Sequence, residues 1–367
     1  WYILHIMIIG VPSEVKNNEN RIGMTPDSVS KLTKKGHEVF VQESAGANIG
    51  FFDQDFISAG AKILKTPEDV YKSSEMIVKV KEPIPSEYKF LRDDLTLFTY
   101  LHLAGDPQNA KKLIDTGVTG IAYETVTSDN GSMPLLAPMS TIAGQLAFTV
   151  GTYHLLKQNL GKGVMIGNLK DIDPRVVTVI GAGVSGTQSI YKALENHAHV
   201  KVVDSSQKKL SELESELGSE NIEYILSTDE SVQSSINESD LVIGSVYVVG
   251  KEAPKVVKKE MLKSMNPGTV MVDVSIDQGG CFETSDPTTH DNPTFLKNDI
   301  VHYCVTNMPG AVPLTATLAL NKATLSYITE LADKGIQKAL EENEHLNNGL
   351  NISNGNIIHP GVKEALD

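Results

Sequence analysis

Cysteine is scarce in this sequence, and so are long apolar runs and motifs that mark a metal or a nucleophile. The two cysteines, Cys281 and Cys304, lack the spacing of metal ligands and are too few for a disulfide framework. We therefore expect two reduced thiols in a cytoplasmic protein. No apolar run reaches the roughly 18 residues that a membrane-spanning helix needs, so we expect no membrane partner. The patterns His-Glu-x-x-His, Cys-x-x-Cys and Gly-x-Ser-x-Gly are absent, and we expect no metal site.

Positive charge is also in deficit. Lysine and arginine number 32 against 46 aspartates and glutamates, which gives a net charge of −14. This balance disfavours a nucleic-acid partner, which would need a basic surface. The 367 residues, 40% hydrophobic and 21% charged, suffice for two globular domains. Residues 1–6 are too short for a signal peptide and lack a cleavage site, so we expect Met7 to be the natural start.

The most informative stretch begins at Val176 as an apolar, β-branched run and breaks into Gly181-x-Gly183-x-x-Gly186, before a helical pattern. Gly181 allows a tight turn, Gly183 lets backbone approach a pyrophosphate, and Gly186 lets the helix pack closely on the strand. Asp204 ends the next apolar run, where a carboxylate can bind the ribose hydroxyls of NAD and repel the extra phosphate of NADP. A glycine pattern alone also fits a structural turn. The strand before it, the helix after it and Asp204 together favour an NAD site.

Strand and helix patterns alternate along most of the chain, which indicates parallel sheets. The predicted fold class is α/β, with two Rossmann-like, doubly wound parallel-sheet domains. An NAD-binding domain, residues 135–313, is inserted into a discontinuous substrate domain, residues 1–134 and 314–367. The long helical pattern from Thr315 has no sheet of its own to cover, so we expect it to return to the first domain. We expect strands at 7–11, 38–42, 61–64, 76–80, 95–101, 119–122, 176–180, 199–203, 241–244, 269–274 and 300–304, and a short polar tail from Asn347.

Four polar residues follow predicted strands or the loops after them, where open parallel sheets bind ligands. Arg21 suits bidentate capture of a carboxylate, although alone it could be a surface charge before a helix. Lys81 could polarise a substrate carbonyl. His102 is a candidate proton carrier, although a lone histidine is more often a packed one. Asp277 stands beside a Gly pair, which suggests backbone close to a ligand. If the two domains face each other with these strand ends, the residues would line a cleft.

A series of motifs occurs in one order from Met7 to about Ala365. They are Lys16-Asn-Asn-Glu-Asn-Arg21, Val78-Lys-Val-Lys-Glu-Pro83, Leu97-Phe-Thr-Tyr-Leu-His-Leu103, Ala122-Tyr-Glu-Thr125, Pro138-Met-Ser140, the glycine pattern, Val272-Asp-Val-Ser-Ile-Asp-Gln-Gly-Gly280 and Asn307-Met-Pro-Gly310. Together they resemble alanine dehydrogenase, in a family that also holds the transhydrogenase alpha subunit. The resemblance implies reversible, NAD-dependent oxidative deamination of L-alanine to pyruvate and ammonia by a homohexamer.

The resemblance also implies roles for single residues. Arg21 and Lys81 resemble the residues that bind the substrate carboxylate, and His102 and Asp277 the catalytic histidine and aspartate. The residues similar to the family's cofactor contacts are Ser140, Gly181, Gly183, Val184, Gly186, Asp204, Lys209, Asn307 and Met308.

The chain departs from the family pattern near the expected cofactor site and elsewhere. The departures are Tyr247, Val249, Thr141, Gln145, Leu314 and the loop Gly167–Asp173. Three alternatives stay open: the NAD(H)-binding subunit of a transhydrogenase, a noncatalytic NAD(H) sensor, and a saccharopine-type dehydrogenase with a larger substrate. Arg21, Lys81 and His102 together favour an enzyme acting on a small carboxylate over the first two.

Overall fold

The computed structural model describes residues 5–248 and 252–366. Most of the segment before Met7, and Val249, lie outside these residues. The chain forms two compact units. Unit 1 comprises Trp1–Met139 and Val312–Asp367, and unit 2 comprises Ser140–Ala311.

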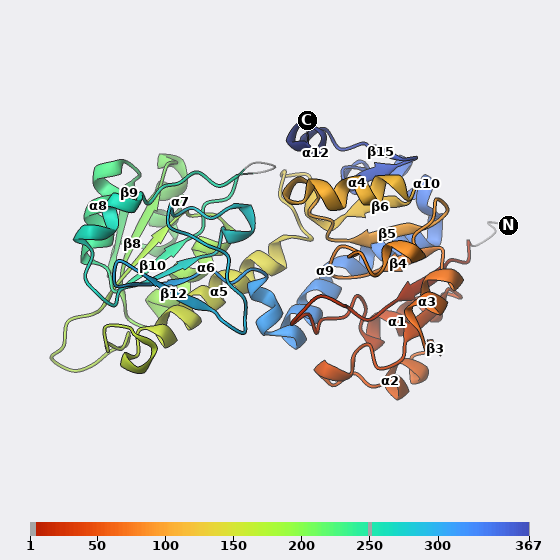
Figure 1. Ribbon diagram of the computed structural model, residues 1–367, viewed down its shortest axis with the longest axis horizontal. Helices are drawn as coiled ribbons and strands as arrows, with labels where there is room; N and C mark the ends of the chain where they lie inside the picture. Colours follow the sequence, from red (N-terminus) through yellow and green to blue (C-terminus); the bar gives the residue numbers. More distant parts are fainter. Residues whose placement is uncertain (1–4, 249–251, 367) are drawn as a thin grey trace. The chain divides into compact units, whose positions relative to one another are not determined.

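Unit 1 is built on an eight-stranded sheet, whose central strands are apolar runs buried between helices (Figure 1). Its strands are β1 (Ile8–Val11), β2 (Glu38–Gln42), β3 (Lys62–Leu64), β4 (Met76–Val78), β5 (Thr96–Thr99), β6 (Thr119–Ala122), β14 (Leu350–Ser353) and β15 (Asn356–Ile357). The order across the sheet is β15-β14-β6-β5-β4-β1-β2-β3. Strands β1 to β6 are parallel, whereas β14 runs antiparallel to β6. The strand order therefore reverses between β1 and β4, which is where such sheets bind ligands.

Three helices of unit 1 start with the same local device, a capping side chain followed by proline. Thr25, Thr66 and Asp106 each accept a backbone N–H of the first helical turn, and each precedes a proline. The α-helices of this unit are α1 (Pro26–Thr33), α2 (Asp53–Ser58), α3 (Pro67–Ser73), α4 (Pro107–Asp115), α9 (Pro313–Lys334), α10 (Ile336–Glu342), α11 (Glu344–Asn347) and α12 (Pro360–Leu366). Its 3-10 helices are η1 (Ala47–Ile49), η2 (Tyr88–Phe90), η3 (Leu103–Gly105) and η4 (Tyr123–Thr125).

The C-terminal segment differs from the predicted long helix and short polar tail. The helix ends at Lys334, because Gly335 adopts φ 79° and breaks the pattern. The tail then adds β14 to the sheet beside β6 and ends in α12, whose Val362 joins the core that contains Leu101 and Leu103. The last part of the chain therefore supports the segments that follow β5 and β6.

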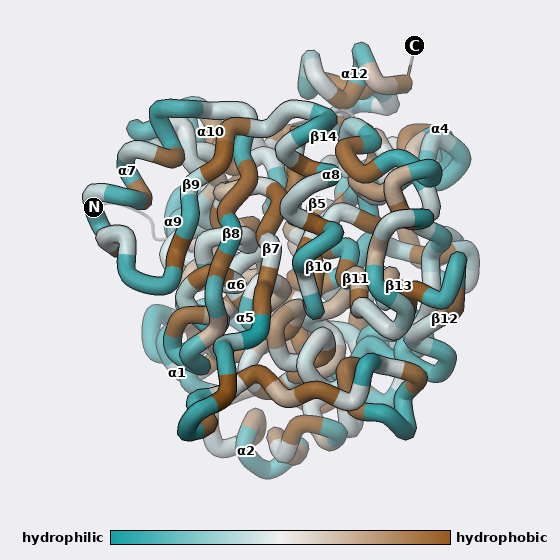
Figure 2. The backbone as a smooth tube through the Cα atoms, turned by 90° about the vertical axis from the view of Figure 1, so that its left-hand side faces the viewer, coloured by the Kyte–Doolittle hydropathy of each residue, from teal (hydrophilic) through white to brown (hydrophobic). Residues whose placement is uncertain are grey.

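Unit 2 has a seven-stranded sheet with the same plan. Its strands are β7 (Val176–Ile180), β8 (His199–Asp204), β9 (Ile222–Leu226), β10 (Leu241–Gly244), β11 (Val270–Asp273), β12 (Thr294–Lys297) and β13 (Ile300–Tyr303). The order is β12-β13-β11-β10-β7-β8-β9, parallel except for β12, and it reverses between β7 and β10. The apolar runs of these strands appear as brown stretches in Figure 2.

Alternate residues of these strands enter two different cores. Val177 and Val179 of β7 pack in one cluster with residues of α5 and α6, whereas Ile180 packs in another with residues of α8. Helices thus cover both faces, as in a doubly wound sheet. The α-helices are α5 (Ala137–His154), which begins in unit 1, α6 (Val184–Glu195), α7 (Gln207–Leu217) and α8 (Asp229–Glu238). The 3-10 helices are η5 (Lys157–Asn159), η6 (Lys259–Ser264), η7 (Ile276–Gln278) and η8 (Met308–Ala311).

The predicted fold class, α/β with two mostly parallel sheets, is confirmed. The segment returning to unit 1 begins at Val312.

Candidate active site

The glycine loop of unit 2 turns at the carboxyl end of β7. Gly181 adopts φ 97°, and a Cβ there would lie 2.6 Å from the carbonyl oxygen of Ser245. A Cβ on Gly186 would lie 1.8 Å from the carbonyl oxygen of Gly181, so only glycine lets α6 approach the turn this closely. Gly183, in contrast, has no atom within 4 Å of its Cβ position. Two of the glycines are required by packing, and the third opens a space beside the backbone.

That space lies at the N-terminus of α6. Gly183 is the N-cap of this 12-residue helix and makes no side-chain capping bond, and Val184 at its first turn is 51% exposed. The first N–H groups of a helix carry a positive partial charge and seek an acceptor. A pyrophosphate supplies such acceptors, so this loop fits a dinucleotide.

Asp204 ends β8 with a buried carboxylate that fixes the loop. One oxygen accepts the N–H of Ala182 at 2.7 Å, and the other accepts the N–H of Ser206 at 2.7 Å. The sequence predicts Asp204 as a ribose contact. The structure adds that the same carboxylate ties β8 to the glycine loop, which holds it beside the space at Gly183.

The other predicted cofactor contacts lie on three separate segments of unit 2. Ser140 is in the first turns of α5, and Lys209 is exposed in the first turn of α7. Asn307 adopts φ 61°, and its carbonyl oxygen lies 3.2 Å from His290 Nε2. Met308 packs into the core of the unit. Their assignment as cofactor contacts stays a prediction.

The predicted catalytic Asp277 is exposed in η7, just beyond β11. A second aspartate, Asp273 at the end of β11, holds the loop of Asp277 through hydrogen bonds. The fully buried Asp273 carboxylate accepts the N–H groups of Ser275 at 2.9 Å and Cys281 at 2.9 Å, and the hydroxyl of Ser285 at 2.5 Å. Burial raises the pKa of Asp273, and these hydrogen bonds oppose that rise. Asp273 lies in the motif Val272–Gly280, but the sequence suggested no role for it, because its contacts form only in the folded loop.

In unit 1, Arg21 is buried and held by a carboxylate. Its Nε donates to Glu19 Oε1 at 2.7 Å and its Nη2 to Glu19 Oε2 at 2.5 Å, a bidentate pair. Burial works against the guanidinium charge, but the Glu19 hydrogen bonds and charge raise the pKa of Arg21 overall. Helix α9 fixes the following residues, since Asn321 accepts the N–H of Thr25 at 2.8 Å and Thr317 that of Ile22 at 3.3 Å. Arg21 thus has a fixed orientation in the interior.

Lys81 follows β4 and is 9% exposed, beside a buried ionic cluster. Lys79, with no exposed surface, lies 2.7 Å from Glu87 and 3.4 Å from Glu14. Burial alone would lower the pKa of Lys79, but these two carboxylates raise it. Burial raises the pKa of Glu14, and Lys79 opposes this. Lys79 and Lys81 stand two residues apart, yet Lys79 is a structural cation and only Lys81 has exposed surface.

His102 stands at the end of an aromatic column. Phe98, Tyr100 and His102 alternate along β5 and its extension, and Tyr123 packs edge-on against Phe98 at 4.6 Å and Tyr100 at 5.1 Å between ring centroids. The imidazole stacks on Tyr100 at 5.7 Å. The backbone of His102 is left-handed, at φ 48° and ψ 33°. This conformation costs a non-glycine residue about 1–3 kcal/mol and needs support from its surroundings.

Glu82 links the segment of Lys81 electrostatically to His102. It forms an ion pair with Lys16, and its Oε2 is buried without a partner among the described residues. Burial would raise the pKa of Glu82, but His102, Lys81 and Lys16 together lower it. The strand ends of unit 1 therefore gather Lys81, His102 and Glu82 in one electrostatic environment.

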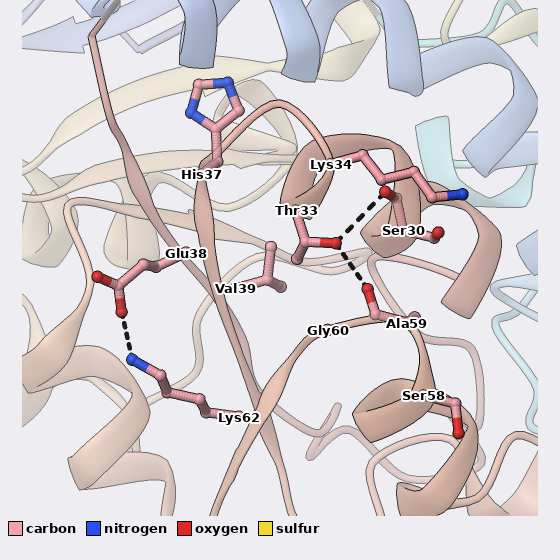
Figure 3. A pocket seen from close by; sticks show the side chains of 10 residues that line it. All are labelled: Ser30, Thr33, Lys34, His37, Glu38, Val39, Ser58, Ala59, Gly60 and Lys62. Atoms are coloured by element: carbon pink, nitrogen blue, oxygen red, sulfur yellow. Dashed lines mark hydrogen bonds and ion pairs between the residues drawn. The ribbon is translucent and has the colours of Figure 1, made fainter.

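A separate hollow on unit 1 carries no comparable chemistry (Figure 3). It lies over α1, β2, α2 and β3. Two of its polar side chains bond within the hollow: Thr33 donates to the carbonyl of Ala59 at 2.6 Å, and Lys62 pairs with Glu38 at 2.5 Å. His37 instead contacts Asp333 of α9, outside the hollow, at 3.0 Å. Across residues 5–248 and 252–366, no cluster of His, Cys, Asp and Glu could hold a metal ion. In the same ranges, every helix is too short or too polar to cross a membrane.

Three departures from the family pattern have clear surroundings. Tyr247 is half exposed, beyond β10. Gln145 donates to Gln188 at 2.9 Å and so links α5 to α6, within unit 2. Leu314, at the start of α9, is 44% exposed.

The doubly wound sheet, the glycine loop and Asp204 define a Rossmann-type dinucleotide-binding fold. The N-terminal domain of the alanine dehydrogenase/PNT family matches residues 10–143, and its C-terminal domain matches residues 147–360. The chain belongs to the alanine dehydrogenase/PNT family, which confirms the resemblance found in the sequence.

Individual relatives cover nearly the whole chain. An alanine dehydrogenase of Mycolicibacterium smegmatis is 45% identical over 98% of this chain and 97% of its own length. One of Bacillus subtilis is 46% identical over 98% and 95%. A solved L-alanine dehydrogenase superposes with a TM-score of 0.93 at 45% identity, covering 98% of this chain and 99% of that one. A transhydrogenase from Sinorhizobium meliloti, 23% identical with a TM-score of 0.81 over 96% of this chain and all of its own, shares the fold.

Proposed function

We propose that this chain catalyses the reversible, NAD-dependent oxidative deamination of L-alanine to pyruvate and ammonia. The observation that carries the proposal is a set of three residues in unit 1: Arg21 in the loop after β1, and Lys81 and His102 just beyond β4 and β5. The chain that holds them is about 45% identical to alanine dehydrogenases over almost its full length. Two cationic side chains suit a small carboxylate, and an imidazole beside them suits proton transfer.

Arg21 and Lys81 bind the substrate carboxylate in this proposal. The Glu19 fork fixes the plane of the Arg21 guanidinium before substrate arrives. Lys81 adds a point charge that also attracts the carbonyl oxygen of pyruvate in the reverse direction. Together they orient the substrate carbon and select 2-amino and 2-oxo acids by their carboxylate.

His102 and Asp277 serve proton transfer and water. When water adds to the oxidised carbon, His102 accepts a proton from that water, and it returns the proton as the amine leaves. Asp277 orients the water or the amine. L-Alanine, water and NAD thus give pyruvate, ammonium, NADH and one proton. General acid–base help of this kind contributes about 10²–10⁴-fold.

NAD, when bound, supplies a hydride acceptor at its nicotinamide ring. The N-terminus of α6 at Gly183 and Val184 would receive the pyrophosphate, and Asp204 the ribose. Asp204 favours NAD over NADP, because its carboxylate would face the extra phosphate. Ser140, Lys209, Asn307 and Met308 are proposed as further contacts.

We also propose a cytoplasmic homohexamer. The buried, unpaired thiols of Cys281 and Cys304 suit a reducing compartment, and the hexamer follows from the resemblance to alanine dehydrogenase. Sedimentation of the purified protein should give six times the 39.8 kDa chain mass. A stable monomer or dimer would contradict the hexamer and leave the reaction untouched.

The reaction is tested by following NADH absorbance with L-alanine at alkaline pH. Activity should require L-alanine and NAD, and D-alanine, bulky amino acids and NADP serve as controls. The absence of signal with L-alanine would overturn the proposal. A strong signal with a long amino acid would indicate the saccharopine-type alternative.

A further inference from the structure

Lys81 and His102 share a feature that side-chain chemistry alone does not explain. Each lies just beyond the end of a strand, outside the sheet ladder, at the edge where β4 and β5 run side by side. In each case a carboxylate from the segment that follows the neighbouring strand accepts the backbone N–H of the residue and of the one before it.

At His102 the carboxylate is Glu124, in η4 after β6. Its Oε1 accepts the N–H of His102 at 2.6 Å and that of Leu101 at 3.1 Å. These bonds fall on the residue with the left-handed backbone, φ 48°. Charged acceptors form the stronger class of hydrogen bond, so Glu124 favours this strained turn over an extended strand.

The C-terminal segment in turn fixes η4. Asn351 donates to Thr125 Oγ1 at 2.6 Å, and the N–H of Ala122 donates to the carbonyl of Gly349 at 2.7 Å. Glu124 is therefore held on both sides by structure within unit 1.

At Lys81 the carboxylate is Glu14, in the loop after β1. Its Oε1 accepts the N–H of Val80 at 2.6 Å, and both oxygens lie 3.4 Å from the N–H of Lys81. The side chain is 2% exposed and is balanced by Lys79. The strand order places β1 beside β4 and β6 beside β5, which gives both carboxylates the same relation to their targets.

We propose that Glu124 and Glu14 are positioning residues, which hold the backbone of His102 and of Lys81 in the geometry that substrate requires. The inference rests on the roles proposed above for His102 and Lys81. Glu124 acts on proton transfer through His102, whereas Glu14 acts on carboxylate binding through Lys81. The two carboxylates therefore affect different kinetic constants.

Steady-state kinetics with L-alanine distinguish the role of Glu124 from that of Glu14. Glu124→Ala should lower kcat about 10²-fold, the size of loss caused by a displacement of about 1 Å, with little change in the KM for L-alanine. Glu14→Ala should raise that KM about tenfold with a smaller change in kcat. Glu124→Gln should recover most of the lost kcat, and Glu14→Gln most of the lost L-alanine affinity, because Oε1 can still accept the backbone N–H. These variants also keep the side-chain volume, so they test the inference if an alanine variant fails to fold.

Double variants test action through the named partner. Glu124→Ala should cause no further loss of kcat in a His102→Ala background, since groups that act as a unit are not additive. The matched control is Asp55→Ala, because Asp55 also accepts a backbone N–H, that of Phe52 at 2.8 Å, but lies exposed on α2. It should keep wild-type constants.

A crystal structure of Glu124→Ala gives a readout that needs no substrate. His102 should leave the left-handed region. A His102 that keeps φ near 48°, or a Glu124→Ala enzyme with wild-type kcat, overturns the inference. If the wild-type protein does not oxidise L-alanine, the proposed function fails, and the backbone of His102 in the variant still decides whether Glu124 holds it.

Discussion

The two units place different chemistry at the same topological position. In both sheets the strand order reverses beside the first strand, between β1 and β4 in unit 1 and between β7 and β10 in unit 2. Unit 2 presents backbone there, in the form of the Gly181–Gly186 turn and the first N–H groups of α6. Unit 1 instead presents side chains, many of them charged and buried.

This difference suits the two kinds of ligand. A pyrophosphate is large and doubly charged, and several N–H groups with a helix dipole can bind it without a buried cation. A three-carbon acid offers few atoms, so its recognition depends on full charges in fixed positions. Unit 1 supplies such positive charges, and it balances the buried cations with the carboxylates of Glu14, Glu19 and Glu87. In the proposed function, the same fold would bind a cofactor through backbone groups and a substrate through side chains.

The largest expected effect comes from unit 1. His102→Ala should lower kcat about 10²–10⁴-fold, because it removes the proposed proton carrier. The affinity for NADH, measured by fluorescence titration, should stay unchanged, since the glycine loop belongs to unit 2. His197→Ala is the control, because His197 also has a left-handed backbone, at φ 58°, but lies exposed after α6. Equal losses of turnover and NADH affinity would contradict the separation of roles.

The next effect comes from unit 2. Asp204→Ala should weaken NAD binding about 10–100-fold, since it removes both a ribose acceptor and the bond to the N–H of Ala182. It should also relax discrimination against NADP, because the repelling carboxylate is gone. The measurement is kcat/KM for each cofactor at saturating L-alanine. An unchanged NAD to NADP ratio would refute the assignment of Asp204.

The glycines of unit 2 allow a sharper test within one loop. Gly186→Ala should lower the free energy of unfolding by about 1–3 kcal/mol, because its Cβ would lie 1.8 Å from a carbonyl oxygen. Gly183→Ala should leave stability nearly unchanged, because its Cβ enters open space, yet it should weaken NAD binding about tenfold by filling that space. Urea unfolding and NAD titration of both variants decide this. A Gly183→Ala protein that binds NAD normally would exclude close pyrophosphate approach there.

The sequence predicts the parts of this structure whose causes are local. The eleven predicted strands are mostly apolar runs rich in β-branched residues, whereas β9, β12, β14 and β15 were not predicted. The glycine turn is required by φ at Gly181 and by contact at Gly186, within one short segment. The fold class follows from the alternation of strands and helices. These features need no knowledge of which strands are neighbours.

The parts that the sequence does not predict depend on that knowledge. Glu14 and Glu124 act on residues far along the chain, and only the order β1-β4 and β6-β5 brings them together. Lys79 and Lys81 look equivalent in sequence and differ in surroundings for the same reason. Strand β14 is short and contains Asn351, whose polarity suggested a loop; its amide is buried and satisfied by Thr125 and the carbonyl of Gly349.

The smallest expected effect concerns pH and contrasts the buried, charged Lys79 of unit 1 with a buried, neutral histidine of unit 2. His302 is fully buried, with Nε2 2.8 Å from Thr284 Oγ1 and its ring stacked on Phe295 at 4.9 Å. Burial lowers the pKa of His302 below its ordinary value of about 6.5. The unfolded chain therefore binds the proton more readily than the folded one. The stability that His302 contributes is complete above the unfolded pKa and is lost as the pH falls from there through the folded pKa.

One such proton changes the free energy of unfolding by at most about 1.4 kcal/mol per pH unit. His302→Gln cannot titrate, so its stability should decline less than that of the wild type between about pH 6.5 and 5. Urea unfolding at several pH values measures the difference, and His199→Gln, a partly exposed histidine on β8, is the control. As the pH falls, hydrogen exchange should show reduced protection in β11 and β13. Protection in β4 and β5 should stay unchanged, because Lys79 is already charged and paired there. If the free energy of unfolding of wild type and His302→Gln falls in parallel with pH, His302 is not buried in the neutral state. Equal loss of exchange protection in both sheets would show that the two units do not respond to acid separately.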